Sequence, residues 1–85
     1  MRLPIQKLDP KATLPTRAHP DDAGLDLYLL EDAVITVDGM SMLRTGVALE
    51  LPQGSVGIIA DRSSLAKKGL KTAGGVIDAG YRGEV

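Results

Sequence analysis

The sequence contains no cysteine, no phenylalanine and no tryptophan. Without cysteine, the chain has no disulfide, no thiolate nucleophile and no cysteine-ligated zinc site. Tyr28 and Tyr81 are its only aromatic residues, so the core has to be built from Leu, Ile, Val, Ala and Met. A chain of 85 residues forms at most one small domain, and its thin core gains from burial against other copies of the chain.

The sequence also lacks an excess of one charge and any long apolar run. Its formal net charge is -1, with basic and acidic residues intermixed, which excludes a general electrostatic attraction to nucleic acid. No apolar stretch approaches the roughly 20 residues that span a bilayer. The first residues lack the apolar segment and cleavage site of a secretion signal. We therefore expect a soluble, cytoplasmic protein that binds neither nucleic acid nor a membrane.

Short strand-like runs separated by turns dominate the chain, which predicts an all-β sandwich, jelly roll or barrel. Asp38-Gly39 is a strong hairpin signal, and Pro52-Gln53-Gly54 fits a type I turn with glycine in the fourth position. A last strand is predicted to start in residues 82–85, so its edge is expected to be covered by further chain or by other copies. The expected strands cover residues 3–8, 25–29, 33–37, 47–51, 56–60, 76–78 and 82–85.

A single short helix is predicted over residues 63–69. Ser63 has the residue type of a helix cap, two lysines fall in the last turn, and Gly69 is a stop signal. A helix N-terminus is an anion site, and Arg62 adds a planar, permanently charged group suited to phosphate oxygens. In the alternative interpretation, a serine only caps the helix and Arg62 pairs with Asp61 or another carboxylate.

Two further clusters carry candidate chemistry. Asp26 lies between leucines, where it either points to solvent or faces a pocket in which a carboxylate would suit Mg²⁺. In the glycine-framed turn of residues 75–83, Asp78 can take a proton from water and Tyr81 can stack on a base or sugar. Main-chain groups around 75–77 could recognise the edge of a base, although an ordinary hairpin with a solvated acid would have the same sequence.

Together the three clusters resemble the first three motifs of the trimeric dUTP pyrophosphatases (dUTPases). The matching segments are AGLDL at 23–27, RSSLA at 62–66 and GVIDAGYRGEV at 75–85. The resemblance implies a jelly roll, or distorted β-barrel, with residues 1–85 as the N-terminal part of the family's domain. It also implies a homotrimer with active sites shared between subunits. The family's fourth motif and glycine-rich arm have no counterpart here, so the domain is expected to be incomplete at its C-terminus.

The resemblance implies Mg²⁺-dependent hydrolysis of dUTP to dUMP and pyrophosphate, by attack of water on the α-phosphorus. In that reaction Asp78 activates the water, Tyr81 packs on the deoxyribose, and Asp26 organises the metal through water. The expected substrate contacts are Arg62, Ser63 and Ser64 to the phosphates, and Thr72, Gly75, Val76 and Ile77 to uracil.

Two positions depart from the family pattern. Thr72 stands six residues before Asp78, where many members have an asparagine that contacts uracil, and Ser64 replaces the glycine of Arg-Ser-Gly. dCTP deaminase shares the fold and similar motifs, but Tyr81 followed by Arg82-Gly83 favours the dUTPase. A third hypothesis is a catalytically inert, truncated oligomerisation module.

Overall fold

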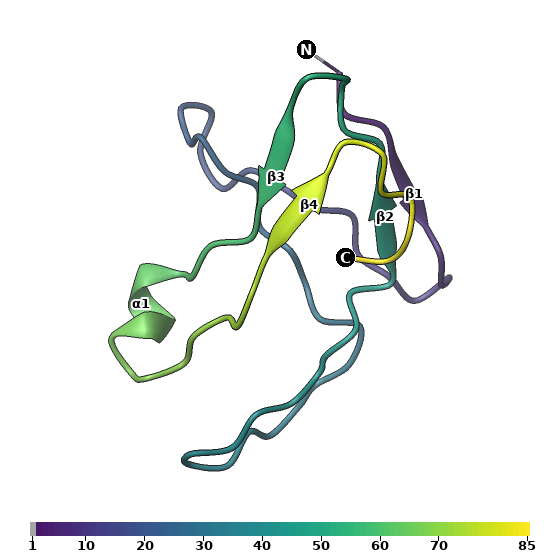
Figure 1. Ribbon diagram of the computed structural model, residues 1–85. Helices are drawn as coiled ribbons and strands as arrows, with labels where there is room; N and C mark the ends of the chain where they lie inside the picture. The colour runs from purple at the N-terminus through teal and green to yellow at the C-terminus, as the bar shows by residue number, and fades with distance from the viewer. Residues whose placement is uncertain (1) are drawn as a thin grey trace. The chain divides into compact units, whose positions relative to one another are not determined.

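The computed structural model describes residues 2–85, which contain four strands and one short helix (Figure 1). The chain divides into two compact units, each with one two-stranded antiparallel sheet. One unit holds Glu50–Tyr81 and the start of the chain up to Pro4, and the other holds Ile5–Leu49 and Arg82–Val85. The predicted all-β class with a single short helix is confirmed. No helix within the described range is long and apolar enough to cross a membrane.

In the unit of Ile5–Leu49, the sheet pairs β1 (Ile5–Lys7) with β2 (Val47–Leu49). Ala48 of β2 also forms an isolated antiparallel bridge with Glu84. The central strand is therefore bonded to chain segments from both ends of the sequence. Val47 and Ala48 are only 1% and 6% exposed, so the core of this unit lies along β2.

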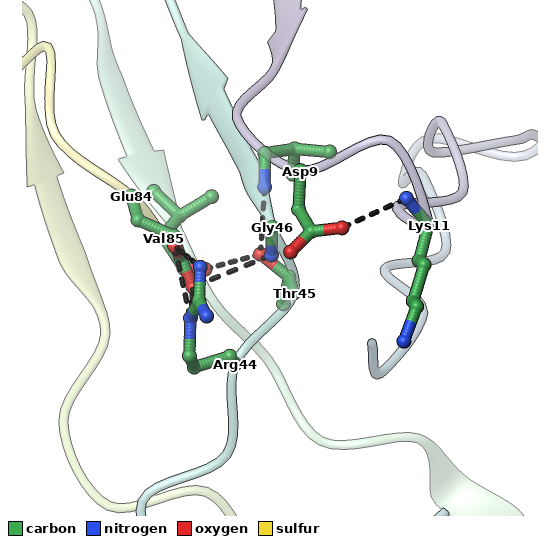
Figure 2. A network of polar contacts seen from close by, with 8 residues as sticks. Asp9, Lys11, Arg44, Thr45, Gly46, Glu84 and Val85 are labelled. Atoms are coloured by element: carbon green, nitrogen blue, oxygen red, sulfur yellow. Dashed lines mark hydrogen bonds and ion pairs between the residues drawn. The ribbon is translucent and has the colours of Figure 1, made fainter. Parts of the chain in front are cut away.

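An ion pair fastens the C-terminal residues to the chain before β2 (Figure 2). The Nε and Nη2 atoms of Arg44 donate to the two carboxylate oxygens of Glu84 at 3.1 and 2.9 Å. The Gly46 N–H donates to the same carboxylate at 3.3 Å, and the Thr45 hydroxyl donates to the Val85 carbonyl. The hydrogen bond between the two side chains lowers the pKa of Glu84 and raises that of Arg44. The strand predicted over 82–85 is not formed; the structure has only the bridge between Ala48 and Glu84 and this polar network in that segment.

The predicted strand over 33–37 is wrong, although the turn that follows it is present. The Gly39 N–H donates to the Thr36 carbonyl at 2.8 Å, and Asp38 takes up the positive φ of 60° that closes the turn. Val34 and Val37 are 91% and 92% exposed. β-branched residues favour a strand because they pack on a half-buried pleated surface, and no such surface covers these side chains in the described chain.

In the unit of Glu50–Tyr81, β3 (Val56–Ile58) pairs antiparallel with β4 (Val76–Asp78). Gly57 lies opposite Ile77, which is the buried residue of β4 at 8% exposure. A Cβ atom on Gly57 would lie 3.1 Å from the Ile77 Cβ. The missing side chain at Gly57 therefore makes room for Ile77 to pack across the two strands.

The turn before β3 lies one residue later than predicted. The Ser55 N–H donates to the Pro52 carbonyl at 3.1 Å, so the turn covers 52–55. Gly54 is its third residue and has a φ of 84°. A positive φ in that position belongs to a type II turn, so the predicted type I turn is wrong. Gly54 is required for its backbone conformation rather than as the last residue of the turn.

Candidate functional site

The end of β4 presents an acid and an aromatic ring from one tight turn. Along the strand, Val76 is exposed, Ile77 is buried and Asp78 is exposed, as the alternation of a pleated strand requires. The Tyr81 N–H donates to the Asp78 carbonyl at 3.0 Å and closes the turn through Ala79-Gly80. The Tyr81 side chain is 47% exposed. The carboxylate and the ring predicted to act on substrate are therefore both accessible to solvent.

One edge of β4 is hydrogen-bonded to β3, and the other edge leaves its main-chain groups open in the described chain. The Ile59 N–H donates to the Gly75 carbonyl at 2.7 Å, which fixes the pairs that exchange hydrogen bonds in this ladder. In an antiparallel ladder, hydrogen-bonded and non-hydrogen-bonded pairs alternate. Gly57 and Ile77 therefore form the next hydrogen-bonded pair, while Val76 belongs to a non-hydrogen-bonded pair and its main-chain N–H and C=O point away from β3. In the described chain β3 is the only strand paired with β4. Of the residues predicted to recognise a base, Val76 thus has both main-chain groups on the open edge.

Gly75 packs too closely on Ile59, the residue directly after β3, for any other residue to fit without movement. Its φ is 136°, a conformation that residues with a side chain rarely adopt. A Cβ atom there would lie 2.8 Å from the Ile59 Cβ and 3.0 Å from the Ile59 carbonyl oxygen. Gly74 also has a positive φ, 96°, but a Cβ atom on it would meet nothing within 4 Å. The two glycines therefore bend the chain into β4, and of the two only Gly75 does so in close contact with Ile59.

The helix α1 (Ser63–Ala66) begins directly after Arg62, which is its N-cap residue. Arg62 is extended, with φ −80° and ψ 127°, and its carbonyl accepts the N–H groups of Leu65 and Ala66 at 3.0 and 2.8 Å. The prediction that a serine caps the helix is wrong, because Ser63 and Ser64 both lie inside the first turn and the helix begins without a side-chain cap. Arg62, Ser63 and Ser64 are all exposed.

The helix ends earlier than predicted, but the predicted glycine stop is confirmed. Gly69 has a φ of 91°. Its N–H donates to the Ala66 carbonyl at 2.9 Å, and the Leu70 N–H donates to the Leu65 carbonyl at 3.0 Å. These two bonds with a left-handed glycine form a Schellman motif. The turn after α1 is therefore closed by main-chain hydrogen bonds, and the lysines expected in the last turn lie outside the helix.

Asp61 and Thr72 form a contact that the sequence does not indicate. The Thr72 N–H and hydroxyl both donate to Oδ1 of Asp61, at 2.7 and 2.8 Å. Both hydrogen bonds lower the pKa of the Asp61 carboxyl, and the bond from the Thr72 backbone has the larger effect. The predicted alternative, in which Arg62 pairs with Asp61, is not found, since no salt bridge joins these two residues in the described part of the chain. No motif could have revealed the contact, because its partners lie eleven positions apart in an irregular connection.

Asp26 belongs to the unit of Ile5–Leu49, whereas the other predicted site residues belong to the unit of Glu50–Tyr81. The predicted strand over 25–29 is reduced to an isolated bridge between Asp26 and Thr16, with N–H to carbonyl distances of 2.7 and 3.2 Å. The Thr16 hydroxyl is also hydrogen-bonded to the Tyr28 hydroxyl. The half-buried Asp26 carboxylate is thus carried by a segment that is fixed at its backbone.

Among the described residues, no three His, Cys, Asp or Glu side chains gather into a group that could hold a metal ion. Mg²⁺ does not require such a group, because it commonly keeps several waters and binds through one or two carboxylates and the phosphates of a substrate. A single carboxylate such as that of Asp26 is compatible with contact to Mg²⁺ through water. The donors present therefore suit a metal that arrives with a nucleotide.

Comparison with known proteins agrees with these motifs. The dUTPase family model matches residues 10–85. A deoxyuridine 5'-triphosphate nucleotidohydrolase of Nocardia farcinica is 49% identical over 98% of this chain and 52% of its own length. The chain spans about half the length of the curated relatives it matches.

Solved structures show the same fold. The dUTPase from phage phi11 of S. aureus superposes with a TM-score of 0.93 at 35% identity, over 100% of this chain and 56% of that chain. A mutant of the Staphylococcus bacteriophage 80alpha dUTPase with bound dUpNHpp gives a TM-score of 0.91 at 34% identity, over 99% and 55%. Another phi11 structure describes the coordination of a structural Mg(II) ion. The architecture is that of an all-β, jelly-roll-like domain. With the family match, it follows that the chain belongs to the dUTPase family.

Proposed function

We propose that this chain carries the water-activating and phosphate-binding residues of a Mg²⁺-dependent dUTP diphosphatase, which converts dUTP to dUMP and pyrophosphate. The observation that carries the proposal is the turn at the end of β4. It presents the accessible Asp78 carboxylate and the Tyr81 ring in a chain of the dUTPase family. A cytoplasmic location is proposed with it, since the substrate is an intracellular nucleotide.

In the proposed reaction, Asp78 orients a water molecule and accepts its proton as the oxygen attacks the α-phosphorus. The bond to the β-phosphate oxygen breaks, and pyrophosphate leaves with the electron pair. The side chains need only position the water and the triphosphate, because phosphoryl transfer to water requires no covalent intermediate. The exposed position of Asp78 supports this role, since a solvent molecule can reach the carboxylate.

The triphosphate is assigned to the Arg62–Ser64 segment. The Arg62 guanidinium is permanently charged and has the geometry for two parallel bonds to phosphate oxygens. The absence of a salt bridge between Arg62 and Asp61 in the described chain supports this assignment, because the charge is not neutralised there. Mg²⁺, organised through water by Asp26, would supply further positive charge to the phosphates.

The base and sugar are assigned to β4 and its turn. The outward-facing N–H and carbonyl of Val76 match the alternating acceptors and donor of a uracil edge, and they support recognition of the base by the main chain. The Tyr81 ring would pack on the deoxyribose and leave no room for a 2′-hydroxyl. We further propose a homotrimer in which neighbouring subunits complete each site.

The test is turnover of the 85-residue chain with dUTP and with dCTP in the presence of Mg²⁺, with pyrophosphate and ammonia measured separately. Pyrophosphate from dUTP and no ammonia from dCTP is the expected result. A stable assembly that neither binds nor hydrolyses dUTP would instead identify an inert oligomerisation module.

Asp78→Asn should keep dUTP binding and lose about 10²-fold to 10⁴-fold in turnover, because an amide has nearly the shape of the carboxylate but is a very poor base. Asp38→Asn is the matched control. It makes the same change at an exposed turn in the other unit, where the φ of 60° suits asparagine. An Asp78→Asn variant that turns over dUTP at the parent rate would show that another group activates the water.

A further inference from the structure

The connection between β3 and β4 carries the residues assigned to the phosphates, yet almost nothing in it is buried. α1 has no buried residue, and within positions 61–72 every residue except the half-buried Ala66 is exposed, with Leu65 and Leu70 at 37% and 40%. Hydrophobic packing therefore contributes little to holding this connection in place. A segment that has to present Arg62 to a triphosphate in one orientation needs another constraint.

The contact between Asp61 and Thr72 supplies such a constraint at both ends of the connection. Two donors of Thr72 meet one carboxylate oxygen, at 2.7 and 2.8 Å, and the acceptor is charged, which makes these bonds stronger than neutral ones. Asp61 immediately precedes Arg62, so fixing the Asp61 side chain also limits the direction in which the chain enters α1. The Schellman motif at Gly69 closes the middle of the same segment.

The contact also determines where the negative charge of Asp61 is directed. With Oδ1 bonded to Thr72, the carboxylate forms no salt bridge with the adjacent Arg62 in the described chain. An unrestrained Asp61 would compete with a phosphate for the guanidinium of its neighbour. Thr72 thus has a second effect, since it keeps Asp61 engaged and leaves Arg62 to a ligand.

We propose that Asp61 and Thr72 are positioning residues, whose contact orders the 61–72 segment and holds the Asp61 carboxylate away from Arg62 so that Arg62 can bind the triphosphate. This inference rests on the proposed dUTP diphosphatase function. It also moves Thr72 from the uracil contact expected from the sequence to a role that acts through Arg62. The two roles predict different losses when the hydroxyl is removed.

The first experiment compares Thr72→Val, which removes the hydroxyl and keeps the shape, with Thr72→Ser, which restores it. We expect kcat/KM for dUTP to fall about 3-fold to 10-fold in Thr72→Val and to return in Thr72→Ser. Inhibition by inorganic tripolyphosphate should weaken by a similar factor, and inhibition by deoxyuridine should be unchanged. Thr13→Val is the matched control, because Thr13 is exposed and lies in the other unit. Weaker inhibition by deoxyuridine with unchanged inhibition by tripolyphosphate would instead make Thr72 a uracil contact and overturn the proposal.

The second experiment uses Asp61→Ala. Charge alone predicts that loss of a carboxylate beside Arg62 strengthens tripolyphosphate binding, whereas the positioning role predicts that it weakens. We expect weaker binding, and no further loss in the double variant with Thr72→Val, because both bonds end on the same oxygen. Tighter binding, or additive losses, would refute the role of the contact.

The two proposals fail in distinguishable ways. A parent chain that hydrolyses dUTP, with a Thr72→Val variant of equal kcat/KM, keeps the proposed function and overturns the positioning role. A parent chain with neither turnover nor affinity for tripolyphosphate overturns both.

Discussion

The substitution Gly75→Ala tests whether the entry into β4 depends on the close contact between Gly75 and Ile59. At a φ of 136°, an alanine costs roughly 1–3 kcal/mol in backbone strain. Its Cβ atom would also lie 2.8 Å from the Ile59 Cβ and 3.0 Å from the Ile59 carbonyl oxygen. Neither can retreat easily, because the Ile59 N–H is bonded to the Gly75 carbonyl at 2.7 Å. We therefore expect a total loss of about 3 kcal/mol.

Such a loss is large for a chain of this size, whose whole stability is of the order of 4–13 kcal/mol. It corresponds to a fall of about 12–24 °C in melting temperature, which thermal unfolding followed by circular dichroism measures. Urea unfolding at fixed pH measures the loss of free energy directly. Gly74→Ala is the matched control, since its φ is also positive and its new Cβ atom would meet nothing within 4 Å. That variant should lose only about 1 kcal/mol. If the two variants melt within a few degrees of each other, the contact with Ile59 is not what constrains Gly75.

Three other predictions concern the sugar contact, the C-terminal ion pair and the metal. Tyr81→Ala should reduce the preference for dUTP over UTP by about 3-fold to 10-fold, because the ring no longer packs on the sugar; unchanged selectivity in competition assays would remove Tyr81 from the sugar site. Glu84→Gln should destabilise the protein near neutral pH, because Arg44 lowers the pKa of Glu84 from its ordinary value of 4.5. A carboxylate whose pKa is lowered by folding contributes its full stability above the ordinary pKa of 4.5, and this stability is lost as the pH falls through the pKa of the folded protein. The difference in unfolding free energy between variant and parent should therefore close only below pH 4.5. A gap of constant size down to pH 2 in acid unfolding would contradict the ion pair as its source. Chelation with EDTA should abolish dUTP turnover and excess Mg²⁺ should restore it, while turnover that persists in EDTA would exclude the proposed metal dependence.

The parts of the fold that the sequence predicts correctly depend on local signals. β4 was expected over 76–78 and lies there, because its alternation of exposed and buried residues matches a paired strand. Gly69 was expected as a stop signal; the helix itself ends at Ala66, and Gly69 closes the turn that follows by main-chain bonds. Both features are determined by residues a few positions apart.

The errors arise where local preference depends on distant partners. The β-branched run over 33–37 has the composition of a strand, yet Val34 and Val37 stay exposed in the described chain because nothing there covers them. Ser63 has the residue type of a helix cap, but Arg62 takes that position. At the site, the motifs identified Asp78, Tyr81 and Arg62 as candidates, whereas the bonds between Thr72 and Asp61 depend on a loop closure that no spacing rule describes.

The alternating direction of the main-chain N–H and C=O groups along β4 limits which substitutions can alter this edge during evolution. A ligand that pairs with Val76 on the open edge meets peptide atoms, which every residue except proline supplies in the same form. Exchanging one side chain for another at this position therefore leaves the pattern of donor and acceptor intact. To alter it, an evolving sequence would have to introduce proline or insert a residue, and an insertion would also turn the Ile77 side chain out of the core.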